Sequence, residues 1–332
     1  MNPIAASNKT ALVLGATGGV GHAIATALQR HGWQVRGMAR NTAQTATKPP
    51  SQPPQREGNL QSDSAIEWIS GDAMNVSDVV RAAQGVSTIV HAVNPPGYRH
   101  WERLVLPMID NTIAAARAAG GARVVLPGNI YNFDPATTPV IRADTPQRAT
   151  SRKGRVRQAM EERLAQAAPE VPSLILRAGD FFGPGARSSW FNQAMVKPGQ
   201  PVKRLTNVAQ GPGHSWAYLP DLAETFASLL DDPNQLQPFE RLQFQGLYDA
   251  SGEDLIEALR RVTGRALPVR QFPWWLMKAL APFGGFPREA AEIAPYWKHP
   301  VRLDNGRLVA LLGAEPATPV DDALRATLVA MD

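Results

Sequence analysis

The chain has 332 residues, of which 44% are hydrophobic and 19% are charged, and it contains no cysteine. Its 34 lysine and arginine residues against 29 acidic residues give a formal net charge of +5. The absence of cysteine excludes a disulfide framework, a thiolate metal site, an iron–sulfur cluster and a cysteine nucleophile. The positive charge is scattered and lacks the long basic, aromatic-rich patch of a nucleic-acid-binding protein, so we expect no nucleic-acid partner.

Neither a membrane anchor nor a secretion signal is expected. No stretch approaches the roughly 20 consecutive apolar residues that span a bilayer. Residues 1–10 lack a basic segment followed by an apolar core. We therefore expect a cytoplasmic protein without a membrane partner, a monomer or homodimer that binds a small-molecule substrate.

The first half of the chain alternates short apolar runs with segments of helical periodicity. Residues 10–14 form an apolar run that stops at Gly15, as a buried parallel strand does, and residues 20–30 carry apolar side chains at helical spacing. The same alternation predicts strands at 34–39, 66–69, 87–92, 123–126 and 173–177, and helices at 76–84, 104–119 and 156–168. These repeated units predict an α/β fold with a doubly wound parallel sheet of the Rossmann type.

Two segments depart from this alternation. Residues 41–64 are polar, proline-rich and aperiodic, which is typical of an exposed, disordered-like insertion. Beyond residue 180, proline-rich joints separate helical stretches, which predicts a smaller, mostly helical C-terminal substrate lobe. Its helices are expected at 189–195, 221–230, 252–262, 274–280, 288–297 and 304–311. We therefore divide the chain into a nucleotide-binding domain over 1–180 and a substrate lobe over 181–332, with 214–230 returning to the first domain.

A glycine-rich motif lies between the first predicted strand and the first predicted helix. In this context Gly15 permits a tight turn, Gly18 lets the backbone approach a pyrophosphate, and Gly21 permits close helix–strand packing. The amides at the start of the helix would face the phosphates, where the helix dipole favours negative charge. The motif and its context predict a dinucleotide cofactor. The expected contacts within the motif are Gly15, Thr17, Gly18, Gly19, Val20 and Gly21.

The residues after the second and third strands bear on the choice of cofactor. An acidic residue after the second strand would bind the adenosine ribose, whereas an arginine suits a 2′-phosphate. Arg40 stands there without an acidic neighbour, which favours NADP(H) over NAD(H), although NAD(H) is possible. For Arg36, a solvated surface charge is the simpler interpretation. Asp72 is placed to accept a hydrogen bond from the adenine amino group or to cap the next helix. Ala73 and Ala92 complete the expected cofactor contacts.

These motifs resemble the short-chain dehydrogenase/reductase superfamily, specifically its extended and atypical branches, which include the NAD-dependent epimerase/dehydratases. The resemblance covers about residues 9–230 and rests also on three later segments. Residues 90–92 read Val-His-Ala, residues 176–185 read Leu-Arg-Ala-Gly-Asp-Phe-Phe-Gly-Pro-Gly, and residues 216–223 read Trp-Ala-Tyr-Leu-Pro-Asp-Leu-Ala. The resemblance implies a Rossmann fold that binds a nicotinamide cofactor. The C-terminal hundred or so residues lie outside it.

The resemblance does not extend to the catalytic triad of the family. That triad consists of a serine or threonine after the fifth strand and a Tyr-x-x-x-Lys pair on the following helix. Matching the motifs places Pro127 at the hydroxyl residue, Lys153 at the tyrosine and Arg157 at the lysine. The chain therefore departs from ordinary alcohol dehydrogenase and sugar epimerase chemistry.

Three functions are compatible with this departure. Residues 153–161 are similar to the helix of the isoflavone-reductase-like reductases, which rely on a lysine. That similarity implies a reductase of a small, fairly apolar carbonyl or enone, with Lys153 as general acid/base or ribose anchor and Tyr131 or Asn129 orienting the substrate. The arginines within 152–157 would disfavour the charged form of that lysine. The alternatives are a non-catalytic, NmrA-like dinucleotide-sensing regulator and a relative of the sugar-nucleotide epimerases and dehydratases. Enzymatic activity is thus an open question, with an NAD(P)-dependent oxidoreductase favoured.

The substrate lobe contains the most aromatic stretch of the chain, residues 272–283. It either lines an apolar substrate pocket as a lid or packs the lobe against the sheet. The aromatic residues that would join it are Trp190, Phe191 and Trp297. A nucleotide-sugar substrate would instead need a cationic cluster for its diphosphate, for which the candidates are Arg177, Arg187 and Lys197. The six histidines show no metal-ligand spacing, so no metal site is expected.

Overall fold

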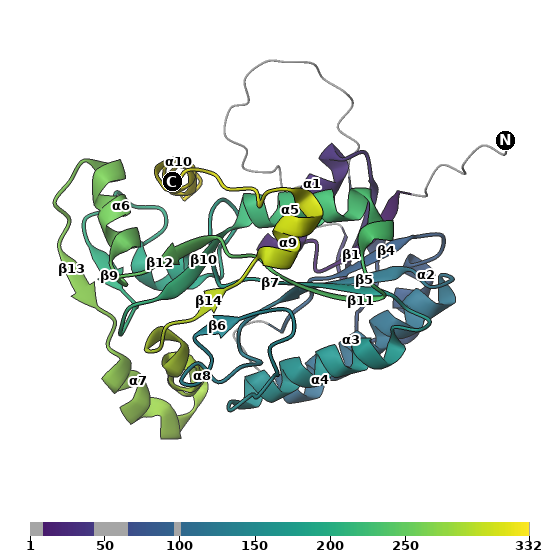
Figure 1. Ribbon diagram of the computed structural model, residues 1–332, viewed down its shortest axis with the longest axis horizontal. Helices are drawn as coiled ribbons and strands as arrows, with labels where there is room; N and C mark the ends of the chain where they lie inside the picture. The colour runs from purple at the N-terminus through teal and green to yellow at the C-terminus, as the bar shows by residue number, and fades with distance from the viewer. Residues whose placement is uncertain (1–8, 43–65, 96–100, 332) are drawn as a thin grey trace, which may run out of the picture.

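The computed structural model describes residues 9–42, 66–95 and 101–331, so the predicted insertion over 41–64 lies almost entirely outside the described residues (Figure 1). Within the described residues, the central sheet has seven parallel strands in the order β11-β7-β5-β4-β1-β2-β3. They are β1 (Thr10–Leu14), β2 (Gln34–Ala39), β3 (Glu67–Ser70), β4 (Thr88–His91), β5 (Arg123–Gly128), β7 (Ser173–Arg177) and β11 (Phe239–Gln243). Because the strand order reverses between β1 and β4, ligands are expected at the carboxyl ends of these two strands.

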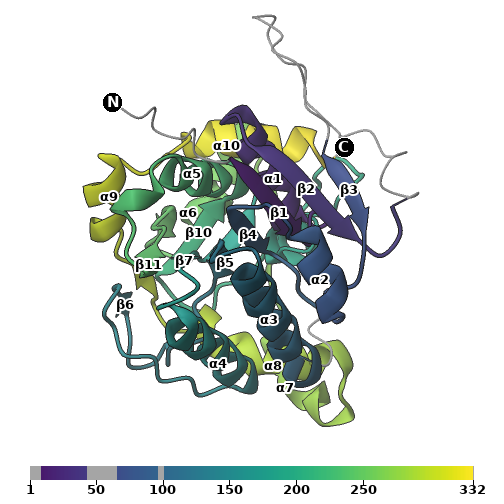
Figure 2. The same ribbon diagram turned by 90° about the vertical axis from the view of Figure 1, so that its right-hand side faces the viewer.

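Helices cover both faces of this sheet (Figure 2). One face carries α1 (Gly19–Arg30), α5 (Leu219–Asp231) and α9 (Gly306–Leu312), and the other carries α2 (Val76–Ala82), α3 (Trp101–Ala118) and α4 (Arg152–Ala167). Successive side chains of β1 point to opposite faces, yet all of them are buried. A strand enclosed on both faces needs apolar residues throughout, which explains its uninterrupted apolar run.

The predicted doubly wound sheet and its alternating helices are confirmed. Most predicted boundaries differ from the observed ones by only a few residues, but α4 begins at Arg152, well before the expected start at 156. Its N-cap is Ser151, whose Oγ accepts a hydrogen bond from the amide of Gly154 at 2.9 Å. A serine cap of this kind explains why the helix extends into the basic, non-periodic segment.

A surface cluster of charges joins α1 to α5. The ring of His31, which follows α1, is bonded to Glu224 at 2.7 Å and to Asp231 at 2.5 Å. Lys9 also pairs with Asp231, at 2.9 Å. Burial alone would lower the pKa of His31, but the hydrogen bonds and charges of the two carboxylates raise it above its ordinary value.

The region beyond residue 180 contains short strands as well as the predicted helices. Within the described residues, three small sheets accompany the main one and consist of β12-β10-β8, β13-β9 and β14-β6. Their strands are β6 (Val140–Ile141), β8 (Asp180–Phe182), β9 (Leu205–Asn207), β10 (His214–Tyr218), β12 (Leu247–Asp249), β13 (Val269–Gln271) and β14 (Arg302–Leu303). The helices are α6 (Asp254–Thr263), α7 (Trp274–Leu280), α8 (Gly285–Ile293) and α10 (Val320–Val329), with shorter turns at Phe191–Met195, Pro233–Gln235, Ala281–Phe283 and Ala294–Trp297. The sequence indicated neither α10 nor these strands. Among the described residues, none of the helices could cross a membrane.

Candidate functional site

The glycine-rich motif forms a tight loop between β1 and α1, at the switch point of the sheet. Gly15 has a φ of +86°, and a Cβ there would lie 2.6 Å from the carbonyl oxygen of Ala92, after β4. A Cβ on Gly21 would lie 2.3 Å from the carbonyl oxygen of Gly15. The amide of Gly18 donates to that same oxygen at 2.9 Å and closes the turn. Only glycine permits this approach of the loop to β4 and of α1 to the loop.

The start of α1 is electrostatically suited to an anion. The helix begins at Gly19, its N-cap is Gly18, which has no side chain, and its first turn contains no acidic residue. Thr17 and Gly18 are exposed, whereas Gly19 and Val20 are half-buried. Backbone amides at such a helix start, with the helix dipole behind them, bind phosphate groups. The residues present therefore fit the diphosphate of a dinucleotide.

Asp72 lies after β3 in a turn of its own. Its Oδ1 accepts a hydrogen bond from the amide of Met74 at 3.0 Å. The cap of α2 is instead Asn75, whose side chain accepts from the first amides of that helix. The interpretation of Asp72 as a helix cap is therefore wrong, and its contact with adenine stays a prediction. The neighbouring Ala73 is buried, and its carbonyl accepts from Asn111 at 2.9 Å.

Two arginines, one on β2 and one directly after it, differ in their surroundings. Arg36 is bonded at the surface to the Glu67 carboxylate at 3.1 Å and to the carbonyl oxygen of Gln84 at 2.6 Å, so its guanidinium is already occupied by neighbouring groups. Arg40 follows the carboxyl end of β2, is exposed, and forms no ion pair within the described part of the chain. Of the two, Arg40 is therefore the one available to a 2′-phosphate.

Lys153, on the first turn of α4, contacts two carboxylates of α8. Its Nζ lies 2.8 Å from Glu292 and also contacts Glu289, and its backbone amide donates to Glu292 at 2.9 Å. Its side chain is only 3% exposed. Arg152 also points to Glu292, at 3.3 Å, so the surroundings of Lys153 contain carboxylates as well as the neighbouring arginines. Burial would raise the pKa of Glu292, but the bonds and charges of Lys153 and Arg152 hold it below its ordinary value.

Arg157, which the sequence comparison places at the lysine position of the short-chain dehydrogenase triad, lies on α4 beside the end of β4. Its guanidinium is 4.9 Å from the ring of Trp101. Complete burial, together with the charge of Arg157, lowers the pKa of His91 to about 3. His91 is therefore neutral at physiological pH, and its Nδ1 lies 2.7 Å from the hydroxyl of Thr112. His91 is therefore a buried, neutral histidine of the core.

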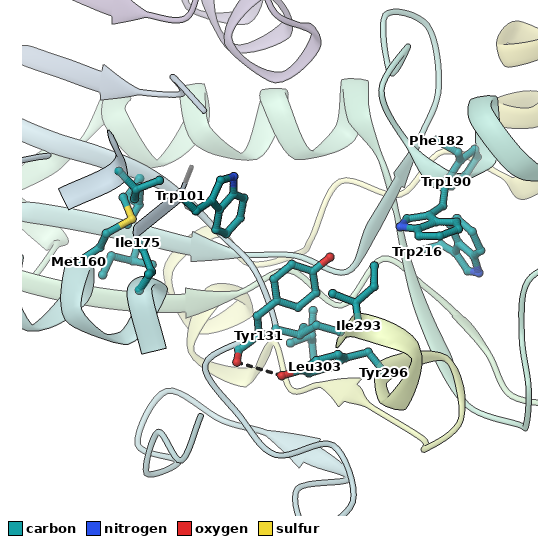
Figure 3. Packing of buried hydrophobic residues seen from close by; sticks show 14 of the residues in the cluster. Trp101, Tyr131, Met160, Ile175, Phe182, Trp190, Trp216, Ile293, Tyr296 and Leu303 are labelled. Carbon is teal, nitrogen blue, oxygen red and sulfur yellow. Dashed lines mark hydrogen bonds between the residues drawn. The ribbon is translucent and has the colours of Figure 1, made fainter. Parts of the chain in front are cut away.

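Tyr131 and Asn129 lie in the segment that follows β5. The side chain of Asn129 accepts from the amide of Tyr131 at 3.0 Å and so shapes the local turn. The ring of Tyr131 is buried 5.1 Å from that of Tyr296, whose hydroxyl donates to the carbonyl of Tyr131 at 2.9 Å. The hydroxyl of Tyr131 points away from this contact (Figure 3).

Arg177, one of the three candidates for a cationic cluster at a substrate diphosphate, is not available for that role. Arg177 is 1% exposed, and its guanidinium donates to both carboxylate oxygens of Glu161 at 2.9 Å. Asn132 also donates to that carboxylate at 2.9 Å. Arg177 therefore joins β7 to α4 inside the protein and is not available to a ligand. Arg187 and Lys197 are exposed.

The aromatic stretch of the substrate lobe divides into a buried and an exposed part. Trp274 lies 5.3 Å from Trp190, ring to ring, and its Nε1 donates to the carbonyl of Val208 at 2.8 Å. Trp190 also lies 5.6 Å from Trp297 and thus forms the centre of a packed cluster, part of which appears in Figure 3. The neighbouring Trp275 is 73% exposed. The stretch thus packs the lobe through one face and presents the other to solvent.

Glu289 and Glu292 are the site residues that sequence reasoning missed. They stand three positions apart on α8, so both face the same side of that helix. The spacing could have suggested a cation partner, but the sequence does not indicate that this partner is Lys153.

Comparison with known proteins bears on the cofactor and the fold. Residues 15–179 match the model of a family described as NAD(P)H-binding. A 3-diazoavenalumate denitrifying reductase from a Streptomyces species is 27% identical over 189 residues, which are 52% of this chain and 57% of that protein. The chain therefore matches little more than half the length of this curated relative.

Solved structures resemble the chain over nearly its whole length. The UDP-glucuronic acid 4-epimerase of Bacillus cereus, in complex with UDP-glucuronic acid and NAD, is 16% identical with a TM-score of 0.70, covering 97% of this chain and 98% of that one. The UDP-glucose 4-epimerase of Bifidobacterium longum, in complex with NAD+ and UDP, is 14% identical with a TM-score of 0.68, covering 96% and 97%. At such identities the likeness establishes the fold alone.

Proposed function

We propose that this chain, which carries an NAD(P)-binding Rossmann domain and has the fold of the epimerase/dehydratase-type short-chain dehydrogenases, is a reductase of a small, fairly apolar carbonyl or enone. The observation that carries the proposal is the glycine loop at the switch point, where Gly15 and Gly21 bring the start of α1 against the end of β4. The similarity to a curated reductase supports the reaction class. NADP(H) is the preferred cofactor in this proposal because Arg40, and no acidic residue, follows β2.

The chemistry divides between the cofactor and the chain. When bound, a reduced nicotinamide supplies a hydride. The chain has to hold the acceptor and deliver the proton that a reduced carbonyl oxygen takes up. The proposed proton donor is the ammonium group of Lys153, which stands at the tyrosine position of the family. Glu289 and Glu292 fix its place, so that it does not sample other rotamers. Tyr131 and Asn129, after β5, are the proposed orienting groups.

A second candidate is a non-catalytic, dinucleotide-sensing regulator. The contacts of Lys153 with two carboxylates of α8 favour it, because a lysine held in this way also serves simply to join α4 to α8. A sugar-nucleotide epimerase or dehydratase has less support. Arg177 is buried in an ion pair with Glu161 and cannot bind a substrate diphosphate, and the solved structures are similar to this chain in fold alone.

Cofactor binding and turnover test these alternatives separately. Fluorescence titration with NADPH and NADH should give tighter binding of NADPH, and Arg40→Ala should remove the difference, while Arg36→Ala leaves it in place. Stopped-flow NADPH oxidation with a panel of carbonyls and enones should then show consumption that Lys153→Met abolishes. The control is Arg155→Met, an exposed residue of the same helix. Tight NADPH binding without consumption of any acceptor would favour the regulator, and failure to bind either dinucleotide would refute both functions.

A further inference from the structure

The segment after β8 lies directly on the glycine-rich loop. Gly19 is not one of the three glycines that a dinucleotide motif requires, yet a Cβ at this position would lie 2.2 Å from the carbonyl oxygen of Gly185. The segment turns tightly, because the amide of Arg187 donates to that same carbonyl at 2.8 Å. Ala186 is buried in the core that α1 shares with the sheet. This contact between Gly19 and Gly185 places the backbone of Arg187 near the start of α1.

The charges at this contact all have the same sign. Arg187 is exposed and forms no ion pair with any carboxylate among the residues that the structure describes. Burial lowers the pKa of His22 in the first turn of α1, and the charge of Arg187 lowers it further. The first turn itself contains no acidic residue, and its amides carry the positive end of the helix dipole. Like charges brought together without an acidic partner repel, unless an anion lies between them.

We propose that Arg187 binds the diphosphate of the dinucleotide cofactor from the side of the C-terminal lobe. The inference rests on the proposed cofactor and adds a ligand that the glycine motif does not contain. The amides of α1 supply only partial charges to the diphosphate, whereas a guanidinium supplies a full charge and two parallel hydrogen bonds. The segment that carries Arg187 follows β8, so occupation of the cofactor site holds that segment against α1.

Binding measurements without any substrate test this role. Arg187→Gln should weaken the binding of NADPH and of NADH by about the same factor, at least tenfold. Both dinucleotides contain the diphosphate, and each loses a charge-assisted hydrogen bond to it. Adenosine 2′-phosphate, which has no diphosphate, should bind the variant and the original protein equally. The dinucleotide affinity of Arg187→Lys should lie between that of Arg187→Gln and that of the original protein. Arg204→Gln, which removes another exposed arginine of the same lobe, should change none of these affinities.

The outcomes separate this inference from the proposed function. If the unmodified protein binds neither dinucleotide, the proposed function fails and Arg187 has no cofactor to bind. If it binds NADPH and Arg187→Gln leaves both affinities unchanged, the Arg187 assignment alone is overturned. Loss of affinity for NADPH but not for NADH would also overturn it, because Arg187 would then contact the 2′-phosphate. Thermal unfolding of the variant should be unchanged, since the side chain is exposed, which excludes misfolding as the cause of weaker binding.

Discussion

Replacing Arg177 by methionine tests whether the buried pair between β7 and α4 stabilises the fold. The guanidinium of Arg177 donates to both oxygens of Glu161 and to the carbonyl of Asn129, and it lies 4.9 Å from the ring of Phe133. Methionine keeps much of the aliphatic volume and removes the charge. The Glu161 carboxylate would then be left buried with neutral partners alone, the amides of Asn132 and Gln147.

The structure sets the size of the expected effect. Removing one member of a buried ion pair costs about 3–5 kcal/mol, because the remaining charge has no compensation. We therefore expect Arg177→Met to lower the free energy of unfolding by about that amount. Adding Glu161→Gln to the same variant removes the uncompensated charge and should recover about 1–3 kcal/mol. Arg163→Met is a control on α4, the helix that carries Glu161, since Arg163 pairs with Asp110 at the surface and its loss should cost at most about 1 kcal/mol.

Urea unfolding followed by circular dichroism measures these differences. A loss below about 1 kcal/mol in Arg177→Met would refute the reasoning, as would a double variant no more stable than the single one. Affinity for NADPH should be unchanged in the protein that stays folded, because Arg177 points into the protein. If the folded variant instead loses affinity for NADPH, Arg177 takes part in binding a phosphate of the ligand.

Three further predictions concern single positions. The raised pKa of His31 means that its ion pairs stabilise the fold fully below the ordinary value of 6.5 and that this stabilisation is lost as pH rises through the raised value. The Tm advantage over His31→Gln should therefore be largest below pH 6.5 and shrink as pH rises above it. Gly154→Ala should lower the Tm although alanine favours helix, because the Cβ would lie 2.1 Å from the carbonyl oxygen of Tyr131, and an unchanged or higher Tm would contradict that packing. Trp274→Ala should cost about 3–5 kcal/mol and Trp275→Ala about 0.5 kcal/mol or less by urea unfolding, and equal losses would show that the burial of the two rings is misassigned.

The elements that the sequence predicts well are those whose cause is local. The apolar run of β1 and the glycine loop after it are set by neighbouring residues, and the structure has both where they were expected. β11 was missed because its polar residues Glu240 and Gln243 interrupt the apolar pattern, although both are buried. Glu240 is compensated by Arg307 of α9, a partner far along the chain that periodicity does not reveal.

The candidate site divides in the same way. Gly15 and Gly21 could be predicted because their constraint is the turn itself. The surroundings of Lys153 could not be, because Glu289 and Glu292 reach it from α8, and only the folded chain brings these segments together. The neighbouring Arg152, Arg155 and Arg157 gave no indication of these carboxylates, although the carboxylates contact Lys153 directly and therefore act on it more strongly than charges farther away.

The position of β11 limits how the two halves of this chain can be exchanged between relatives. The strand comes from the C-terminal half and pairs with β7, and α5 packs its apolar side chains into the core beside α1. A chain shortened at residue 180 would leave β7 as an unpaired edge and uncover much of one face of the sheet. We expect such a fragment to aggregate. Recombination that introduces a new substrate-binding region must therefore keep α5 and β11 together with the N-terminal half. The segments that can be exchanged are the loops and helices of the C-terminal half that lie before, between and after α5 and β11.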